Sequence, residues 1–422
     1  MSSILKVLKN RNFLFLWVGQ LISQFGDCLV SMALISLVYD KFNASALAYA
    51  KLIFFIIIPV FLIGPIAGIC VDRCNRKKIM ITCDVIRAVL VTLIPFLMQM
   101  DRGIIFVYIC VFLIYSSTRF FLPSKLSIIP DLVSGDKLLA ANSLTTTSRT
   151  IALVFSFAIA GAAVQFMGWK ASFFIDALTY IVSAILILRI NISGVAKEIK
   201  HDVSIAKDVI SEVVHKDIIS DIKQGKDYVL NDPQMRFVSW VFFLLMSGVG
   251  AISVVLIVFI QNNFGTATWH LSFLAAFLAM GFMVGALLFA KLGQDLLKTR
   301  AIFISFVLSG AILALFSQLI NPETSILKAG FMAFLWGATS SPIVIILYTL
   351  LHEEVPNKLR GKTFSAIEIF IHSGFLLFMF VCACLSNILR PGEIIMYVGV
   401  VFVCLGLFSL CRMPIDNKRS NC

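Results

Sequence analysis

Charged residues are scarce in this sequence: they make up 14% of its 422 residues, whereas hydrophobic residues make up 59%. Ordinary soluble domains contain about 45–50% apolar and about 25% charged residues. The mean hydropathy of +0.96 points the same way. The composition therefore excludes an ordinary soluble domain and indicates a chain that lies mostly within a membrane.

Residue patterns that carry enzyme chemistry are also lacking. The sequence has no phosphate-binding loop, no serine, histidine and aspartate arrangement for nucleophilic catalysis, and no zinc-ligand spacing. Its ten cysteines are scattered, and the close pairs Cys70/Cys74 and Cys382/Cys384 lack the paired spacing of a zinc site. We interpret them as small apolar packing residues. The sequence predicts no enzyme, no ATP-driven motor within the chain, no metal and no cofactor.

Long apolar runs dominate what is present. A segment of about 20 apolar residues can cross the hydrocarbon core of a bilayer as a helix, which satisfies its own backbone hydrogen bonds. The predicted fold class is an all-α membrane protein with twelve transmembrane helices in two six-helix pseudo-repeats. The first run is too long for the core of a signal peptide, so we expect it to be retained. The predicted spans are 13–38, 47–71, 79–99, 103–122, 142–166, 170–190, 236–260, 268–291, 299–320, 325–351, 363–386 and 392–411.

The net charge of +12 could suggest a nucleic-acid partner, but its distribution indicates a membrane topology instead. Basic residues cluster before the first span, between the second and third spans, and after the twelfth, whereas the loops on the other side are short and poor in bases. The positive-inside rule then predicts that both termini are cytoplasmic. The clusters are Lys6, Lys9 and Arg11; Arg73, Arg76, Lys77 and Lys78; and Arg412, Lys418 and Arg419.

A polar segment separates six spans from six. It predicts an N-terminal half (1–190), a cytoplasmic linker (191–235) and a C-terminal half (236–422). Apolar residues recur in the linker at near-helical spacing, which favours an amphipathic helix on the membrane surface or on the helix bundle. Its role as a tether or as a partner-binding helix stays open. The recurring residues are Ile205, Val209, Val213, Ile219 and Ile222.

The two halves resemble each other at corresponding positions. Aligning Val133 with Val355 places Asp131 on Glu353, and both segments put an acid, a valine, a turn residue and a base ahead of the next helix. The end of span eight (285–300) is basic with one aspartate, like the loop after span two. Two repeated halves around a central substrate path are typical of a transporter.

The loop between spans two and three reads GICVDRCNRKKIM (68–80), with five charges in seven residues. In this position it resembles the loop signature of the major facilitator superfamily. The resemblance covers essentially the whole chain and implies the fold of that superfamily. It also implies a cytoplasmic gate motif formed by Gly68, Asp72, Arg73, Arg76 and Lys77.

Within this motif, the resemblance implies that Asp72 faces the start of span eleven, which follows Arg360-Gly361-Lys362. A helix start carries unpaired N–H groups and partial positive charge, so an aspartate there can latch the cytoplasmic side shut. The bases of the loop have a second explanation, because anionic lipid headgroups and the positive-inside rule favour them at this depth.

Three further stretches resemble the macrolide-efflux and siderophore-exporter branch of the superfamily: 10–27, 130–144 and 168–180. This resemblance implies a secondary transporter, a monomer spanning the bacterial cytoplasmic (inner) membrane many times, that uses the proton gradient to export an amphipathic small molecule such as a drug or siderophore. Alternatives are a lipid or lysolipid transporter, an importer of the same fold, and a non-transporting membrane sensor. Asn75 replaces the second glycine of the loop signature, and SFAIAG (156–161) lacks the Gly-Pro of the antiporter motif.

Polar residues form a stripe on span one. Gln20, Gln24, Asp27 and Ser31 follow at i, i+4, i+7 and i+11, so they share one helical face. A polar stripe is costly to expose to lipid, and we expect it to line the substrate cavity. Asp27 lies near mid-span and is the first candidate for proton coupling; a structural hydrogen bond to a neighbouring helix is the alternative.

Other ionisable residues within spans suggest further roles. Glu368 and His372 share a face of span eleven with Ser365, so they form either a proton relay or a local pair that stabilises the helix start. Asp176 on span six is expected to act in packing or gating. Of the bases, Arg149 is expected in a buried network and to line the substrate cavity. Asp84 and Arg87 are expected to pair with each other or to join Arg119, Lys125 and Arg149; for Arg119 and Lys125, snorkelling to the cytoplasmic surface is the alternative.

Overall fold

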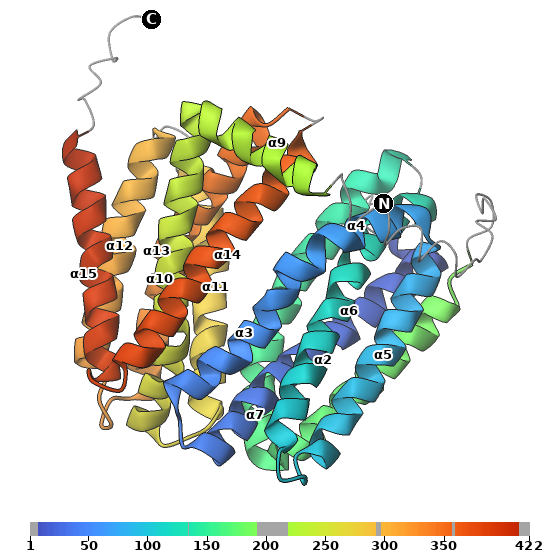
Figure 1. Ribbon diagram of the computed structural model, residues 1–422, viewed down its shortest axis with the longest axis horizontal. Coiled ribbons are helices and arrows are strands. Elements are labelled where there is room, and N and C mark those ends of the chain that lie inside the picture. Colours follow the sequence, from blue (N-terminus) through green and yellow to red (C-terminus); the bar gives the residue numbers. More distant parts are fainter. Residues whose placement is uncertain (1–6, 134, 192–217, 293–296, 357–358, 413–422) are drawn as a thin grey trace, which may run out of the picture.

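The computed structural model describes residues 7–133, 135–191, 218–292, 297–356 and 359–412, and the regular elements in these ranges are all helices (Figure 1). They form two bundles side by side, α2 to α7 and α10 to α15. The helices of the first bundle are α2 (Arg11–Phe42), α3 (Ala46–Leu62), α4 (Gly64–Arg73), α5 (Arg76–Leu97), α6 (Gly103–Leu132) and α7 (Leu138–Leu188), with a 3₁₀ turn at Gly135–Lys137. After α9 (Ile218–Asn231) come α10 (Pro233–Phe264), α11 (Trp269–Leu292), α12 (Lys298–Leu319), α13 (Ile326–Glu354), α14 (Arg360–Leu385) and α15 (Pro391–Arg412).

The twelve predicted spans are confirmed as helices. Ten helices in the described ranges are long and apolar enough to cross a membrane. One of them, α7, is 51 residues long and holds two predicted spans, with Gly168 at a φ of 79° between them. The second predicted span is the pair α3 and α4. The all-α fold class with its two six-helix pseudo-repeats is therefore confirmed.

The second span is one run in the sequence but two helices in the structure. α3 ends at Leu62, and α4 begins at Gly64 with Pro65 in its first turn. Proline has no N–H to donate to the carbonyl one turn back, and its ring collides with that turn, so a continuous helix stops there. Pro65 is well suited to the first turn of a new helix, where that N–H would have no partner.

The bundles are joined at one end, which we call the far end because α9, the start of α2 and the end of α15 lie at the opposite, terminal end (Figure 1). Tyr49 Oη donates to Gln261 Oε1 (3.0 Å) across the far end. The amide of Gly161 donates to Ser272 Oγ (2.9 Å), and Thr268 Oγ1 donates to the Gly161 carbonyl (3.1 Å). A Cβ added at Gly161 would lie 2.1 Å from the Ser272 Cβ, so this contact requires glycine.

The terminal end repeats one ion pair in each bundle. Arg76 Nη1, at the start of α5, lies 2.9 Å from Asp131 Oδ2 near the end of α6. Lys298 Nζ, at the start of α12, lies 2.5 Å from Glu353 Oε2 near the end of α13. Asp131 and Glu353 are the acids that the sequence alignment of the two halves superimposes. The pseudo-repeat thus extends from the helices to individual side chains.

α9 lies on the C-terminal bundle. Tyr228 Oη donates to the Glu354 carbonyl (3.0 Å), and Lys362 Nζ donates to Gln224 Oε1 (2.9 Å). A Cβ added at Gly225 would lie 2.3 Å from the Lys362 carbonyl oxygen, which shows how closely α9 approaches α14. The described part of the linker therefore lies on the helix bundle, which is one of the two locations that the sequence predicts. The positions Ile205, Val209 and Val213, and the side chains of Ile219 and Ile222, lie outside the described residues.

Candidate functional site

A cavity of about 490 Å³ lies between the two bundles. Helices of the N-terminal bundle supply most of its wall, and α14 supplies the facing wall. Arg119 on α6 and Glu368 on α14 form an ion pair between the bundles, with 3.6 Å between Nη1 and Oε1. The lining mixes polar and apolar side chains, including Val60, Tyr115, Thr118, Leu122, Arg149, Ser365 and Ile369. We call this space the central cavity.

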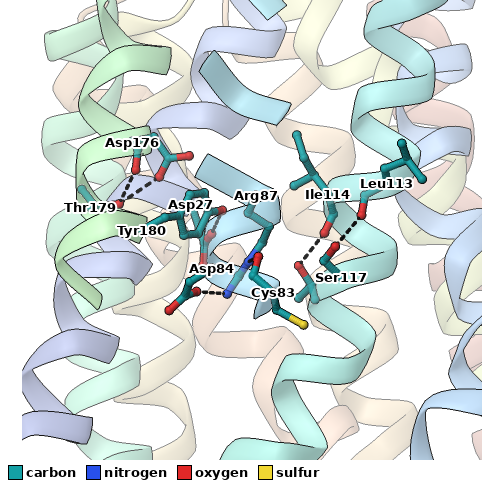
Figure 2. Close-up of polar contacts among 11 residues, drawn as sticks. Asp27, Cys83, Asp84, Arg87, Leu113, Ile114, Ser117, Asp176, Thr179 and Tyr180 are labelled. Carbon is teal, nitrogen blue, oxygen red and sulfur yellow. Dashed lines mark hydrogen bonds and ion pairs between the residues drawn. The ribbon is translucent and has the colours of Figure 1, made fainter. Parts of the chain in front are cut away.

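A polar cluster lies within the N-terminal bundle, and Figure 2 shows how its side chains converge. It consists of Asp27 on α2, Asp84 and Arg87 on α5, and Asp176 and Tyr180 on α7. Tyr180 Oη donates a hydrogen bond of 2.6 Å to Asp27 Oδ1. Asp84 and Arg87 form an ion pair one turn apart on their own helix, as the sequence predicts.

Arg87 is the centre of this cluster. Its side chain is 2% exposed. The guanidinium lies between two rings, 4.5 Å from the centroid of Phe121 and 4.5 Å from that of Tyr180. The electron-rich ring faces attract a cation, most strongly where water is excluded. Arg87 therefore has both an acid and two aromatic faces to compensate its burial.

Asp176 is completely buried. Its Oδ1 accepts a hydrogen bond from Thr179 Oγ1 (3.1 Å), but its Oδ2 has no hydrogen-bond partner among the described residues. The carboxylate packs against α2, where a Cβ added at Gly26 would lie 1.9 Å from Oδ1. Gly26 is thus the residue that lets Asp176 approach the helix that carries Asp27.

The cluster contains more carboxylates than cations. Asp27, Asp84 and Asp176 face the single guanidinium of Arg87, which pairs directly with Asp84. Two carboxylates therefore have no direct cationic partner within the cluster. Ionised groups at membrane depth are costly unless they are paired or reach water. A proton bound to Asp27 or Asp176 would remove one unpaired charge.

Asp27 differs from the other two acids because it is exposed. Tyr115, on whose hydroxyl Asp27 acts electrostatically, lines the central cavity. The Asp27 carboxylate thus combines a hydrogen bond from buried Tyr180 with an exposed side.

The other residues of the span-one stripe lie near Asp27. Ser31 Oγ donates to the Asp27 carbonyl (2.8 Å), and Gln24 Nε2 donates to the Arg149 carbonyl (2.9 Å). Gln20 and Gln24 line a second, narrower cavity of about 20 Å³ between α2, α6 and α7, which we call the narrow cavity. The lining of the central cavity, as far as the structure describes it, includes none of the four stripe residues.

The structure favours snorkelling for neither Arg119 nor Lys125, and the expectation that Arg149 belongs to a buried network is wrong. Lys125 does not reach the surface, because it is 8% exposed and lines the narrow cavity. Arg119 pairs with Glu368 beside the central cavity instead of snorkelling. The buried network is built around Arg87, whereas Arg149 is exposed and lines both cavities. Side-chain direction within the bundle, which spacing along one helix does not give, accounts for these differences.

Glu368 and His372 share a face of α14, but their side chains do not contact each other. The His372 ring nitrogen Nδ1 lies 2.8 Å from the Glu368 carbonyl oxygen. The Glu368 carboxylate instead contacts Arg119 on the other bundle. This contact would break if the two bundles separated at this point.

The loop after α4 is described in part. Arg76 Nη1 donates to Asp131 and to the Ser127 carbonyl, and Lys77 Nζ donates to the carbonyls of Leu188 and Ile190 at the end of α7. Lys77 therefore caps a helix C-terminus, where cations are stabilised. The side chains of Gly68, Asp72 and Arg73 lie outside the described residues.

Tyr180 and Lys125 are site residues whose position sequence reasoning missed. Tyr180 is four residues after Asp176, which places both on one face of the same helix, and that spacing is a usable signal. No comparable signal marks Lys125, since the residues opposite it come from helices distant in the sequence.

Known proteins resemble this chain over most of its length. A model of the Major Facilitator Superfamily matches residues 16–379. The uncharacterized MFS-type transporter YkuC of Bacillus subtilis (strain 168) is 25% identical, over 84% of this chain and 81% of its own. Macrolide efflux protein A of Streptococcus pyogenes is 22% identical over 96% of each chain.

Solved structures share the fold. The crystal structure of a bacterial homologue of the iron transporter ferroportin in an inward-facing state has a TM-score of 0.69 and 15% identity, and it covers 95% of this chain and 98% of its own. A POT family transporter in complex with 5-aminolevulinic acid has a TM-score of 0.70 and 12% identity, with 97% and 99% covered.

Proposed function

Because the chain belongs to the major facilitator superfamily and is a multi-pass membrane transporter, we propose that it exports amphipathic small molecules by alternating access, driven by the proton gradient. The observation that carries this proposal is the exposed carboxylate of Asp27 within the N-terminal bundle, which is hydrogen-bonded to buried Tyr180, while the same bundle supplies most of the wall of the central cavity. A candidate proton site and a candidate substrate path thus share one bundle.

The arrangement of the two bundles supports alternating access. Hydrogen bonds and the glycine contact at Gly161 close the far end, while the central cavity lies between the bundles nearer the terminal end. We assign the terminal end to the cytoplasm, in agreement with the basic clusters. In this conformation the cavity then takes its substrate from the cytoplasmic side.

Export is the direction that similarity to Macrolide efflux protein A favours. Macrolide efflux protein A is an efflux protein, and it aligns over nearly the full length of both chains. The mixed polar and apolar lining of the central cavity suits a molecule with both kinds of surface. The substrate that we propose is accordingly an amphipathic organic molecule.

The proton would bind to the acidic cluster. In this conformation a proton on Asp27 or Asp176 relieves an unpaired charge, and reorganisation of the halves would expose Asp27 to the other side of the membrane. Arg87 stays paired with Asp84 when the proton leaves, so one positive charge remains beside the carboxylates of the cluster. Glu368 is the second candidate for coupling, because it is the acid that joins the bundles through Arg119.

Uptake into inverted membrane vesicles tests the proposal. A panel of macrolides, siderophores and lysolipids is offered to vesicles that hold the wild-type chain and are acidic inside, with Asp27→Asn and Glu368→Gln as variants. We expect gradient-dependent accumulation by the wild type and its loss in Asp27→Asn. Loss in Glu368→Gln alone would move the proton to α14. Accumulation of every compound without dependence on the gradient would refute proton coupling.

A further inference from the structure

The narrow cavity presents cations without a matching acid. Lys125 and Arg149 line it, and its lining, as far as the structure describes it, contains no Asp or Glu. Lys125 is 8% exposed, and among the described residues no hydrogen bond or ion pair involves it. Gln20 Nε2, which is also buried, has no hydrogen-bond acceptor there. These three donors share one space.

The surroundings of Lys125 do not balance its charge. The charged groups near its ammonium are Arg149, Asp27 and Arg87, and two of these three are cations. The carboxylate of Asp27 already accepts the hydroxyl of Tyr180. The nearby Arg119 and Glu368 pair with each other, so Glu368 is engaged. A buried ammonium in such surroundings is costly unless an anion joins it.

The donors suit a carboxylate. An ammonium, a guanidinium fork and an amide N–H together offer the charge-assisted hydrogen bonds that a carboxylate accepts. The volume limits the size of the group that can enter, because the narrow cavity has about 20 Å³ against about 490 Å³ for the central cavity, so it admits a small head group and not the whole molecule. Arg149 lines both cavities, so it marks where they adjoin.

We propose that the narrow cavity binds the carboxylate of the transported molecule while the central cavity holds the apolar body. Lys125 and Arg149 would pair with the anion, and Gln20 would donate to it. Val60, Leu122 and Ile369 would contact the body. The substrate class is then an amphipathic organic acid or zwitterion. This inference rests on the proposed transport function and narrows its substrate.

Binding to the purified full-length chain in phosphatidylcholine nanodiscs tests the assignment without any proton gradient. The probes are N-acetylphenylalanine and its neutral amide, which differ in the carboxylate alone. Thermal unfolding and the fluorescence of Trp17, which lines the narrow cavity, report binding. We expect the acid to bind, and to bind at least about tenfold more tightly than the amide. Lys125→Met and Arg149→Gln should each remove that preference, and Lys125→Arg should retain it.

A second readout separates a binding role from a structural one. If Lys125 has no partner in the free protein, Lys125→Met should raise the unfolding temperature when no acid is present. A lower temperature in Lys125→Met, or equal binding of acid and amide by the wild type, would overturn the assignment. The same measurement in nanodiscs of phosphatidylglycerol provides a further test. Loss of acid binding there would also overturn the assignment, since an anionic lipid headgroup would then fill the cavity. Loss of acid binding with intact proton-driven uptake refutes this inference alone, whereas intact binding without coupled uptake refutes the proposed function alone.

Discussion

Gly161→Ala is expected to open the far end of the transporter. An alanine Cβ at this position would lie 2.1 Å from the Ser272 Cβ and 2.7 Å from the Thr268 carbonyl oxygen, so α7 and α11 could not keep their present approach. Overpacking of this kind costs roughly 1–3 kcal/mol. The contact joins the halves when the far end is closed, so the cost falls on that conformation. The ratio of closed to open molecules should then fall about 5- to 150-fold.

Spin labels measure this shift directly. Asp101 and Glu323 are exposed in the hairpins of opposite bundles at the far end, and a label at each reports the distance between them. We expect Gly161→Ala to increase the population with the longer distance. Gly399→Ala is the matched control, because its Cβ would lie 2.7 Å from the Gly310 carbonyl oxygen inside the C-terminal bundle. If Gly161→Ala gives the same distribution of distances as Gly399→Ala, the idea that Gly161 holds the far end shut is refuted.

Three further predictions concern charged residues. Arg87→Met should lower the free energy of unfolding by about 3–5 kcal/mol in thermal or denaturant unfolding, because it leaves Asp84 buried without its partner, and adding Asp84→Asn should restore much of the loss. Lys298→Gln should change the same quantity by less than about 1 kcal/mol, since its ion pair with Glu353 is exposed. Asp72→Asn should reduce transport without reducing the folded protein in the membrane, and normal transport by this variant would dismiss the latch.

Local patterns in the sequence were sufficient for the helices. Hydropathy over about 20 residues depends on the segment itself, so the twelve spans could be predicted one at a time. The break at Pro65 was missed, although proline is a local signal, because the apolar run continues on both sides of it. The alignment of Asp131 with Glu353 also anticipated a real correspondence, since each forms the same ion pair in its own bundle.

The site was predicted less completely, because its contacts join distant parts of the chain. Periodicity placed Gln20, Gln24 and Asp27 on one face, but it could not identify Tyr180, which lies 153 positions from Asp27. The choice of Arg149 over Arg87 as the buried arginine failed for the same reason. Which face of a helix meets its neighbours is decided by packing of the whole bundle, and one helix alone does not reveal it.

Proton release from energised inverted vesicles tests the central claim, that substrate export is driven by protons exchanged at Asp27. A pH-sensitive dye follows the acid interior after addition of a compound that the wild-type chain accumulates. The account predicts that this compound discharges the pH gradient in wild-type vesicles and leaves it intact in vesicles with Asp27→Asn, at equal amounts of folded protein. Equal discharge in both preparations would contradict the assignment of Asp27, and accumulation by the wild type with no discharge would contradict proton-driven export itself.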